Sequence, residues 1–182
     1  HEDFANDQKS GGNSLRLNYA SSFMGGRIDL TALYGVNDYG SLTLQTAPSV
    51  RRESRYQEDG SNGEIGAVFT RALGSRSTSE TRFIHEFSDN NGVSNSRTTL
   101  SGVASPEQRF ESDSRASETI LRSLVRFEQS PKLTWELGGE VAYNMLETEQ
   151  AFSIGGAPVL LPSASVRVKE TRGEVFGKTT WR

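Results

Sequence analysis

The 182-residue sequence has no cysteine, so neither a disulfide framework nor a thiolate metal site is possible. It also has no run of about 18 apolar residues, which excludes a conventional membrane-spanning helix. Basic and acidic residues number 20 and 23 and are interspersed along the chain, and the net charge is -3. Because nucleic-acid binding needs a concentrated basic surface, we expect no nucleic-acid partner.

Helical periodicity is hard to find, whereas alternation of apolar and polar residues is common. The segment KLTWELGGEVAYNM, residues 132–145, carries Leu, Trp, Leu, Val, Tyr and Met in one phase and Thr, Glu, Glu and Asn in the other. Since side chains of a strand point alternately to two faces, this segment is predicted to be one long amphipathic strand. The longest uncharged stretch, residues 151–166, contains two glycines and two prolines and is expected to be a loop.

Four strand-like segments end in an aromatic residue before a short connection, at intervals of roughly fifty residues. The segments are residues 13–19, 64–69, 118–127 and 173–181. After each of the first three comes a short turn, a second strand and then a polar connection rich in Gly, Asn and Ser. These long connections are predicted at Gly35–Gln57, Ser88–Ser114 and Glu147–Ser165, although residues 41–46 and 50–57 could extend the strands. The motifs GSNG at 60–63 and NNG at 90–92 are typical of turns.

Strict alternation of short and long connections is typical of outer-membrane barrels, which have short periplasmic turns and longer extracellular loops. The aromatic residues agree with this fold, since a ring of them at one level is expected at a membrane interface. We expect that role for Tyr19, Phe69, Phe127, Trp135 and Trp181, with Tyr34 and Tyr143 in a second ring. Polar residues on the other strand face would line a lumen: Arg122, Arg126, Glu136, Glu140, Glu174 and Lys178.

Three stretches, residues 69–87, 116–170 and 171–182, resemble the barrel region of TonB-dependent outer-membrane receptors. The hairpin SPKLTWELGGE and the strand GEVFGKTTWR are similar to that family's pattern of strand, short turn and strand. The resemblance covers most of the chain from about Glu64 and implies a barrel of about 22 strands with a plugged lumen. It also implies a plug domain and the TonB system as partners, and a siderophore, haem, cobalamin or carbohydrate as cargo.

Catalytic and metal chemistry find little support in the sequence. His85 has no second internal histidine and no cysteine to join it, so a packed or interfacial ring is expected rather than a metal or haem ligand. Glu136 and Glu140 share a strand face and could be imagined as a hydrolase pair, but lumen lining explains them more simply. The cluster Arg51, Arg52 and Arg55 could attract an anionic ligand or lipopolysaccharide, or could be solvated loop residues. We expect no cofactor.

The sequence therefore predicts an all-β fold, an antiparallel meander of long amphipathic strands that forms part of an outer-membrane β-barrel. Residues 1–182 are expected to be one partial barrel region of seven to nine strands, with no plug domain, in the outer membrane of a Gram-negative bacterium. The predicted function is transport rather than catalysis, with lipid bilayer and lipopolysaccharide as partners. A porin-like barrel and a soluble antiparallel β binding module remain alternatives. Exposed sheet edges would make an isolated fragment aggregate or pair with another copy.

Overall fold

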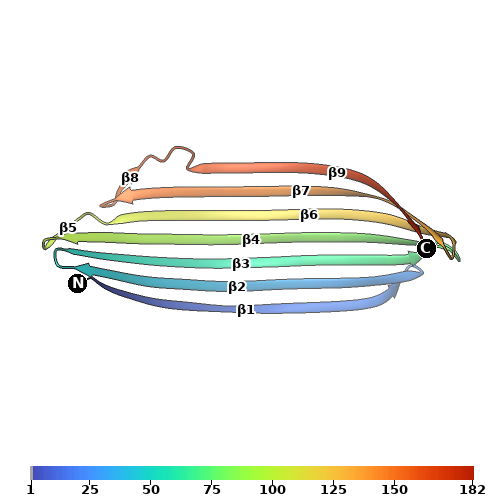
Figure 1. Cartoon of the computed structure of the whole chain (residues 1–182), viewed down its shortest axis with the longest axis horizontal. Coiled ribbons are helices and arrows are strands. Elements are labelled where there is room, and N and C mark those ends of the chain that lie inside the picture. The colour runs from blue at the N-terminus through green and yellow to red at the C-terminus, as the bar shows by residue number, and fades with distance from the viewer. Residues whose placement is uncertain (1) are drawn as a thin grey trace.

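A computed structural model, which describes residues 2–182, shows one antiparallel β-sheet in a single layer (Figure 1). Seven strands are long and two are short, and no helix occurs among the described residues. The elements are β1 (Asp3–Phe23), β2 (Gly26–Ala47), β3 (Val50–Ala72), β4 (Ser77–Leu100), β5 (Val103–Ala104), β6 (Gln108–Ser130), β7 (Leu133–Ile154), β8 (Ala157–Val159) and β9 (Ser165–Trp181).

Each long strand pairs with the next long strand along the chain, in the order β1, β2, β3, β4, β6, β7, β9. The short strands β5 and β8 extend the hairpin connections by pairing with the ends of β4 and β7. The all-β antiparallel meander expected from the sequence is confirmed, and so is the expected number of strands.

Two-residue turns join several of the strands. The residues at the two central positions account for the conformation of these turns. Met24–Gly25, Ser101–Gly102 and Gly155–Gly156 all have positive φ at both positions. Positive φ at both central residues defines the type I′ turn, whose twist matches that of the flanking strands. A glycine at the second position of each turn adopts this conformation without steric cost.

The long loops predicted at Gly35–Gln57, Ser88–Ser114 and Glu147–Ser165 are much too long. Most of these residues are strand, as the sequence allowed for residues 41–46 and 50–57, and each range contains one shorter connection. β2 continues to Ala47 and turns through two residues, Pro48 and Ser49, into β3. The other two connections at this end of the sheet span residues 101–107 and 155–164 and include β5 and β8. These segments lack a regular apolar phase, so their composition resembles that of loops, yet most of their backbone groups pair with neighbouring strands.

The turn signals at 60–63 and 90–92 are also wrong, because both motifs lie in mid-strand. Gly60 pairs with Asn90, so the two motifs face each other across β3 and β4. The loop predicted at residues 151–166 is only partly correct, because β7 continues to Ile154 and β8 occupies Ala157–Val159. Cross-strand hydrogen bonding from both sides fixes these residues in the sheet despite their turn-prone composition.

The sheet has almost no hydrophobic core. Among the described residues Ala142, at 1% exposure, is the one buried hydrophobic residue, and no large side chain is fully buried. A sheet with an apolar face normally buries that face against a second layer, which this chain does not supply. Its apolar surface therefore requires a partner outside residues 2–182.

Candidate functional site

The strand register sorts the side chains onto two faces that differ in character. One face, which we call the band face, carries a continuous apolar band across all seven long strands. Strongly exposed members of this band are Leu15, Leu17, Leu30, Ile65, Phe83, Leu121, Val125, Leu137, Val141 and Val175. We call the other side the opposite face.

The apolar band covers only the half of each strand nearest the connections Met24–Gly25, Leu73–Arg76 and Pro131–Lys132. We call this the turn-side half and the remainder the far half. The boundary on the band face is a hydrogen-bonded row of mostly polar residues: Asn13, Val36, Ser61, Asp89, Arg115, Glu147 and Arg167. On β7 the band runs from Leu133 to Met145, and a transmembrane strand needs about 9–11 residues.

On β7, the two glutamates of the turn-side half are less exposed than the apolar residues beside them. On β7, Leu137 and Val141 are 70% and 55% exposed, whereas the side chains of Glu136 and Glu140 are 18% and 17% exposed. Soluble proteins show the reverse order, because apolar residues go inside and charged ones stay in water. These two carboxylates on the opposite face are thus covered by their neighbours, whereas the apolar residues of β7 on the band face are not.

The six residues predicted to line a lumen all lie on this opposite face and form a ladder of ion pairs. Glu136 accepts from Arg126 at 2.7 Å, and Lys178 lies 3.9 Å from its other oxygen. Glu140 lies between Arg122 at 3.9 Å and Arg172 at 3.6 Å. Each carboxylate is therefore neutralised by cations from neighbouring strands, an arrangement that does not leave Glu136 and Glu140 as a pair of reactive carboxylates. The lumen itself stays a prediction.

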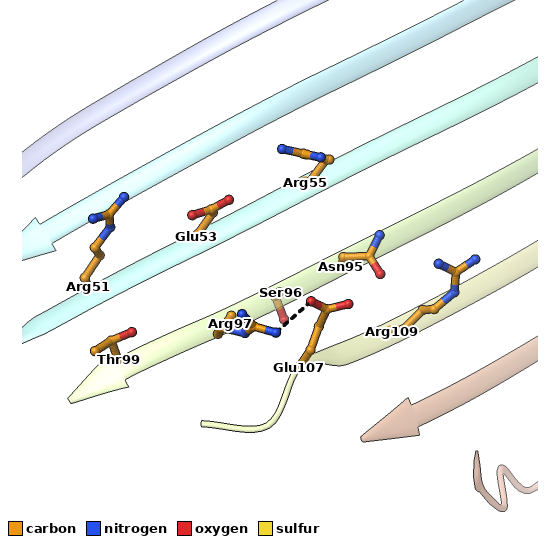
Figure 2. Close-up of a pocket in the computed structure, with 9 residues that line it drawn as sticks. All are labelled: Arg51, Glu53, Arg55, Asn95, Ser96, Arg97, Thr99, Glu107 and Arg109. Atoms are coloured by element: carbon orange, nitrogen blue, oxygen red, sulfur yellow. Dashed lines mark hydrogen bonds and ion pairs between the residues drawn. The ribbon is translucent and has the colours of Figure 1, made fainter. Parts of the chain in front are cut away.

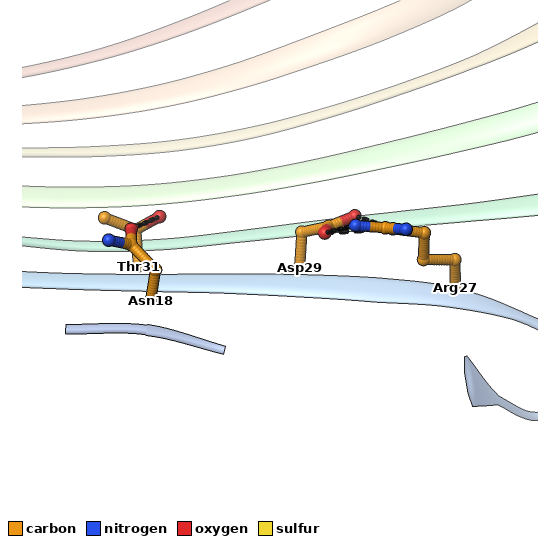
Figure 3. A network of polar contacts seen from close by, with 4 residues as sticks. All are labelled: Asn18, Arg27, Asp29 and Thr31. Carbon is orange, nitrogen blue, oxygen red and sulfur yellow. Dashed lines mark hydrogen bonds and ion pairs between the residues drawn. The ribbon is translucent and has the colours of Figure 1, made fainter. Parts of the chain in front are cut away.

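The same pattern of polar contacts continues on β1 and β2. Arg27 donates to both carboxylate oxygens of Asp29, with Nη2 at 2.7 Å from Oδ1, and Thr31 donates to Asn18 Oδ1 at 3.3 Å (Figure 3). All four side chains project from one side of the sheet, the opposite face. Charges of both signs thus follow this face from one edge strand toward the other.

The five predicted interface aromatics lie on the band face in the turn-side half. They do not share one hydrogen-bonded row. The hydrogen-bonded row that contains Tyr19 serves as the reference. Phe69 lies two residues nearer the short turns than this row, Phe127 and Trp135 lie six residues nearer, and Trp181 lies eight residues nearer. The five rings therefore follow an oblique line across the sheet.

A second group of rings lies at the boundary with the far half. Tyr34 and Phe87 are in one hydrogen-bonded row, with ring centroids 6.5 Å apart, and Tyr143 lies one pleat away in the row of His85. His85 Nδ1 is 2.8 Å from Thr119 Oγ1, and its ring centroid is 6.2 Å from that of Phe87. No group of three or more potential metal ligands occurs among residues 2–182.

Beyond the boundary, the band face carries an arginine-rich pocket of about 280 Å³ (Figure 2). Of the cluster predicted from sequence, Arg51 and Arg55 belong to it, but Arg52 lies on the opposite face. Arg109 and Arg97 join them from β6 and β4, and Arg97 donates to Glu107 at 3.1 Å. The strand register adds Arg97 and Arg109 to Arg51 and Arg55, and no local pattern in the sequence indicates that these four side chains meet.

On the opposite face, four carboxylates lie in one hydrogen-bonded row at the boundary between the halves. Glu64, Glu86 and Glu118 are direct cross-strand neighbours, and Glu170 follows beyond Asn144. They line a hollow of about 710 Å³. None of these four carboxylates has an ion pair within the described residues, whereas Glu136 and Glu140 in the ion-pair ladder each have two.

No family model matches the chain, and no curated protein is similar to it in sequence. Among solved structures, it is similar to the ferric yersiniabactin uptake receptor FyuA from Yersinia pestis, with a TM-score of 0.56 and 13% identity. The match covers 94% of this chain and 25% of that receptor, so the chain corresponds to about a quarter of its length. The fold is therefore that of a segment of an outer-membrane β-barrel wall.

The comparison shows the fold and no specific activity, because the identity is low. It agrees with the expectation of an outer-membrane barrel at the level of the fold. Among residues 2–182, no helix is long and apolar enough to span a membrane.

Proposed function

We propose that this chain is part of the barrel wall of a TonB-dependent receptor that takes up a scarce ligand across the outer membrane of a Gram-negative bacterium. The band face would contact lipid, and the opposite face would line the lumen. A plug domain, from elsewhere in the complete protein, and the TonB system would be its partners. No catalytic role is needed for this function.

The observation that carries the proposal is the exposed apolar band together with the reversed exposure on β7. Leu137 and Val141 are exposed while Glu136 and Glu140, beside them on β7, are mostly covered. An exposed apolar band across seven strands is far too large a patch for the surface of a soluble monomer. In an outer-membrane barrel, apolar side chains point outward to lipid and polar side chains point inward to the lumen. This arrangement gives both faces of the sheet a favourable environment.

The oblique line of aromatic rings supports the placement of the band face against lipid. Eight residues along a strand correspond to ~26 Å, and six strand spacings correspond to ~29 Å. A line from Tyr19 to Trp181 therefore runs at about 40° to the hydrogen-bond direction. Strands of outer-membrane barrels tilt by about 35–45°, so at this tilt the rings would all lie in one plane parallel to the membrane.

Strand length supports a role for the far half outside the membrane. β4 has 24 residues, about twice the 9–11 that span the bilayer. The far halves would form a collar above the membrane, and ligand contacts would come from strands as well as from turns. The segments 35–57, 88–114 and 147–165, predicted from the sequence as long loops, would supply these contacts mainly as strands.

The proposal is tested by placing an arginine within the apolar band of the complete protein. Leu137→Arg should disfavour insertion by about 1–2 kcal/mol, because a cation between the interface and the bilayer midplane loses part of its hydration. The matched control is Thr70→Arg, which lies on the opposite face one row away and next to Glu80. Outer-membrane fractionation and the heat-modifiable migration of the folded barrel would be measured for both variants.

Selective loss of the folded barrel in Leu137→Arg supports lipid contact at the band face. Equal assembly of both variants, or purification of the wild-type protein without detergent, would contradict it. A barrel that assembles normally but conducts small solutes without TonB would point to a porin-like channel instead.

A further inference from the structure

The far half of the opposite face is almost free of charge. Between the row of Ser14 and the row of Asn6, Glu58 is the one charged side chain on this face within the described residues. We call this surface the neutral field. It consists of the alternate opposite-face positions within residues 6–14, 35–43, 54–62, 88–96, 108–116, 146–154 and 166–168.

The same strands carry many charges on their band face, so the neutrality is specific to one side. In the far half the band face holds Asp38 and Asp59 in one row and Arg55 and Arg109 in another. A strand surface that needed only to remain hydrated could carry charges on either face. The sharp difference between the faces indicates that the neutral field meets something other than bulk water.

The polar residues of the neutral field are mainly asparagine, serine, threonine and glutamine. Amide and hydroxyl side chains both donate and accept hydrogen bonds, whereas carboxylates only accept and guanidinium groups only donate. At the centre of the field, the amides of Asn37 and Asn90 both lean over Gly60. A Cβ atom built at Gly60 would lie 2.6 Å from Asn90 Oδ1 and 2.8 Å from Asn37 Oδ1, so the two amides occupy the space that a side chain at residue 60 would take.

Aromatic rings complete the neutral field. Tyr39 and Tyr56 have ring centroids 6.0 Å apart at an interplanar angle of 54°. Phe110 and Phe152 are cross-strand partners in the same hydrogen-bonded row as Tyr56. Two strand spacings, about 10 Å, separate Tyr56 from Phe110. The rings therefore form apolar platforms at two places on a surface otherwise made of amides and hydroxyls.

The single carboxylate of the neutral field already has a partner. Tyr56 donates its hydroxyl to Glu58 Oε2, which fixes the ring of Tyr56 over Gly92. The nearest other charges are Arg52, in the row beyond the field toward the strand ends, and Arg16, Glu64 and Glu86, in the row on the other side. No arginine or lysine occurs within the field to neutralise an anionic ligand.

We propose that the neutral field binds an uncharged, hydroxyl-rich ligand of the oligosaccharide class. Ring faces of the ligand would lie against Tyr56 and Phe110, and its hydroxyls would pair with amides such as Asn37 and Asn90. Combined apolar faces and paired polar groups are what a small-molecule site provides, and tyrosine, serine, glycine and asparagine are the usual residues of adaptable binding surfaces. This inference rests on the proposed uptake function, of which it specifies the cargo.

The test uses the complete protein purified in detergent and an array of defined probes. The neutral probes are fragments of starch, xylan, mannan and cellulose. The charged probes are uronate fragments of pectin and alginate and ferric catecholate and hydroxamate chelates. We expect binding of at least one neutral fragment, and a loss of affinity of about tenfold in Tyr56→Ala and in Phe110→Ala, because aromatic contacts contribute beyond buried area.

A matched pair of variants on β4 distinguishes binding at the neutral field from an effect of charge elsewhere on the same strand. Asn90→Asp places a charge in the neutral field and should weaken binding of the neutral fragment at least about tenfold, because the aspartate can no longer donate a hydrogen bond. Asn91→Asp places the same charge one residue away on the band face and should leave affinity within about twofold. Heat-modifiable migration would show that both variants are folded.

Binding restricted to the charged probes, absence of binding to every probe, or equal effects of the two aspartate variants would overturn the assignment. If the membrane-inserted protein instead takes up a ferric chelate with the help of the TonB system, the proposed receptor function is supported and the proposed oligosaccharide cargo is wrong. Purification of the protein as a detergent-free monomer would instead remove the receptor function itself.

Discussion

The ring of Phe176 lies directly over Gly138, its cross-strand partner on β7. A Cβ atom at Gly138 would lie 2.7 Å from Cζ of Phe176 and 2.6 Å from the carbonyl oxygen of Ser123. The guanidinium of Arg122 covers the same ring, with Cζ 4.5 Å from its centroid. The glycine thus makes room for an aromatic ring that would otherwise stand out from the opposite face.

The pair Gly138–Gly139 causes no bulge in β7. The register shift between β6 and β7 lies at Glu128 and Ser130.

The first prediction concerns this glycine. Gly138→Ala should destabilise the folded barrel by about 1–3 kcal/mol, because the added methyl group overlaps Phe176 and the backbone of β6. The measurement is the temperature at which the complete protein loses its heat-modifiable folded form. Gly173→Ala on β9 is the matched control, since a Cβ atom there meets nothing within 4 Å. Equal transition temperatures for the two variants would show that the overlap is relieved without cost.

The second prediction concerns the two tryptophans. Trp135 and Trp181 are 46% and 75% exposed on the band face at the turn end of the sheet. If they lie at the headgroup level, lipids brominated near the headgroup will quench their fluorescence more than lipids brominated at the chain ends. Variants of the complete protein that retain one tryptophan at a time would be measured in vesicles. Efficient quenching by a water-soluble agent, with none by lipid, would place the tryptophans away from the bilayer.

The third prediction concerns the ion-pair ladder. Arg126 and Glu136 are 2.7 Å apart, but the arginine side chain is 54% exposed. We expect a double-mutant cycle of Arg126→Gln and Glu136→Gln to give a coupling of about 0.5–1 kcal/mol, since solvent screens exposed pairs. The coupling should shrink when salt is raised to about 1 M, where the Debye length is only about 3 Å. A large coupling that salt does not change would indicate that the pair is shielded from solvent in the complete barrel.

The fourth prediction concerns pH in the neutral field. The hydrogen bond that Tyr56 donates to Glu58, together with partial burial, raises the pKa of Tyr56 from its ordinary value of 10.0 to about 12. The stabilisation from this bond is therefore fully present below about pH 10 and is lost as the pH rises through about 12. Ultraviolet titration of phenolate absorbance should show one late-ionising tyrosine that disappears in Tyr56→Phe. In Glu58→Gln the pKa of Tyr56 should fall toward 10; an unchanged pKa would exclude Glu58 as its cause.

The turn-side half of the fold was predictable because its strands obey a simple two-residue period. In residues 132–145 one phase is apolar and the other polar, and the structure places these two phases on the two faces of β7. The short turns were predictable for a related reason, since Met24–Gly25 and Pro131–Lys132 interrupt that alternation with turn-forming residues. Both signals are local, so no knowledge of neighbouring strands was needed.

The far half was not predictable from local signals. Residues 54–62 and 88–96 are rich in Ser, Asn and Gly, a composition typical of loops, and they carry no apolar phase. They are strands because each lies between two partners that satisfy its backbone hydrogen bonds. Such pairing is a property of the whole sheet, so composition alone misassigned these residues.

The candidate sites show the same division. The six charges on the opposite face were assigned by phase alone, because alternation within a strand fixes which side chains share a face. The pocket that joins Arg51 and Arg55 to Arg97 and Arg109, and the amides that meet over Gly60, depend on register between strands. A one-residue change of register would move every side chain of a strand relative to its neighbours.

The sequence by itself determined the all-β class, the apolar and polar phases of the strands near the short turns, and the residues that share each face. It could do so because backbone geometry fixes a period of two wherever a strand forms. Only the tertiary structure decided how far each strand extends, which side chains from different strands meet, and that one far-half face is neutral while the other is charged. Those features follow from pairing between segments distant in the chain, which no local pattern specifies.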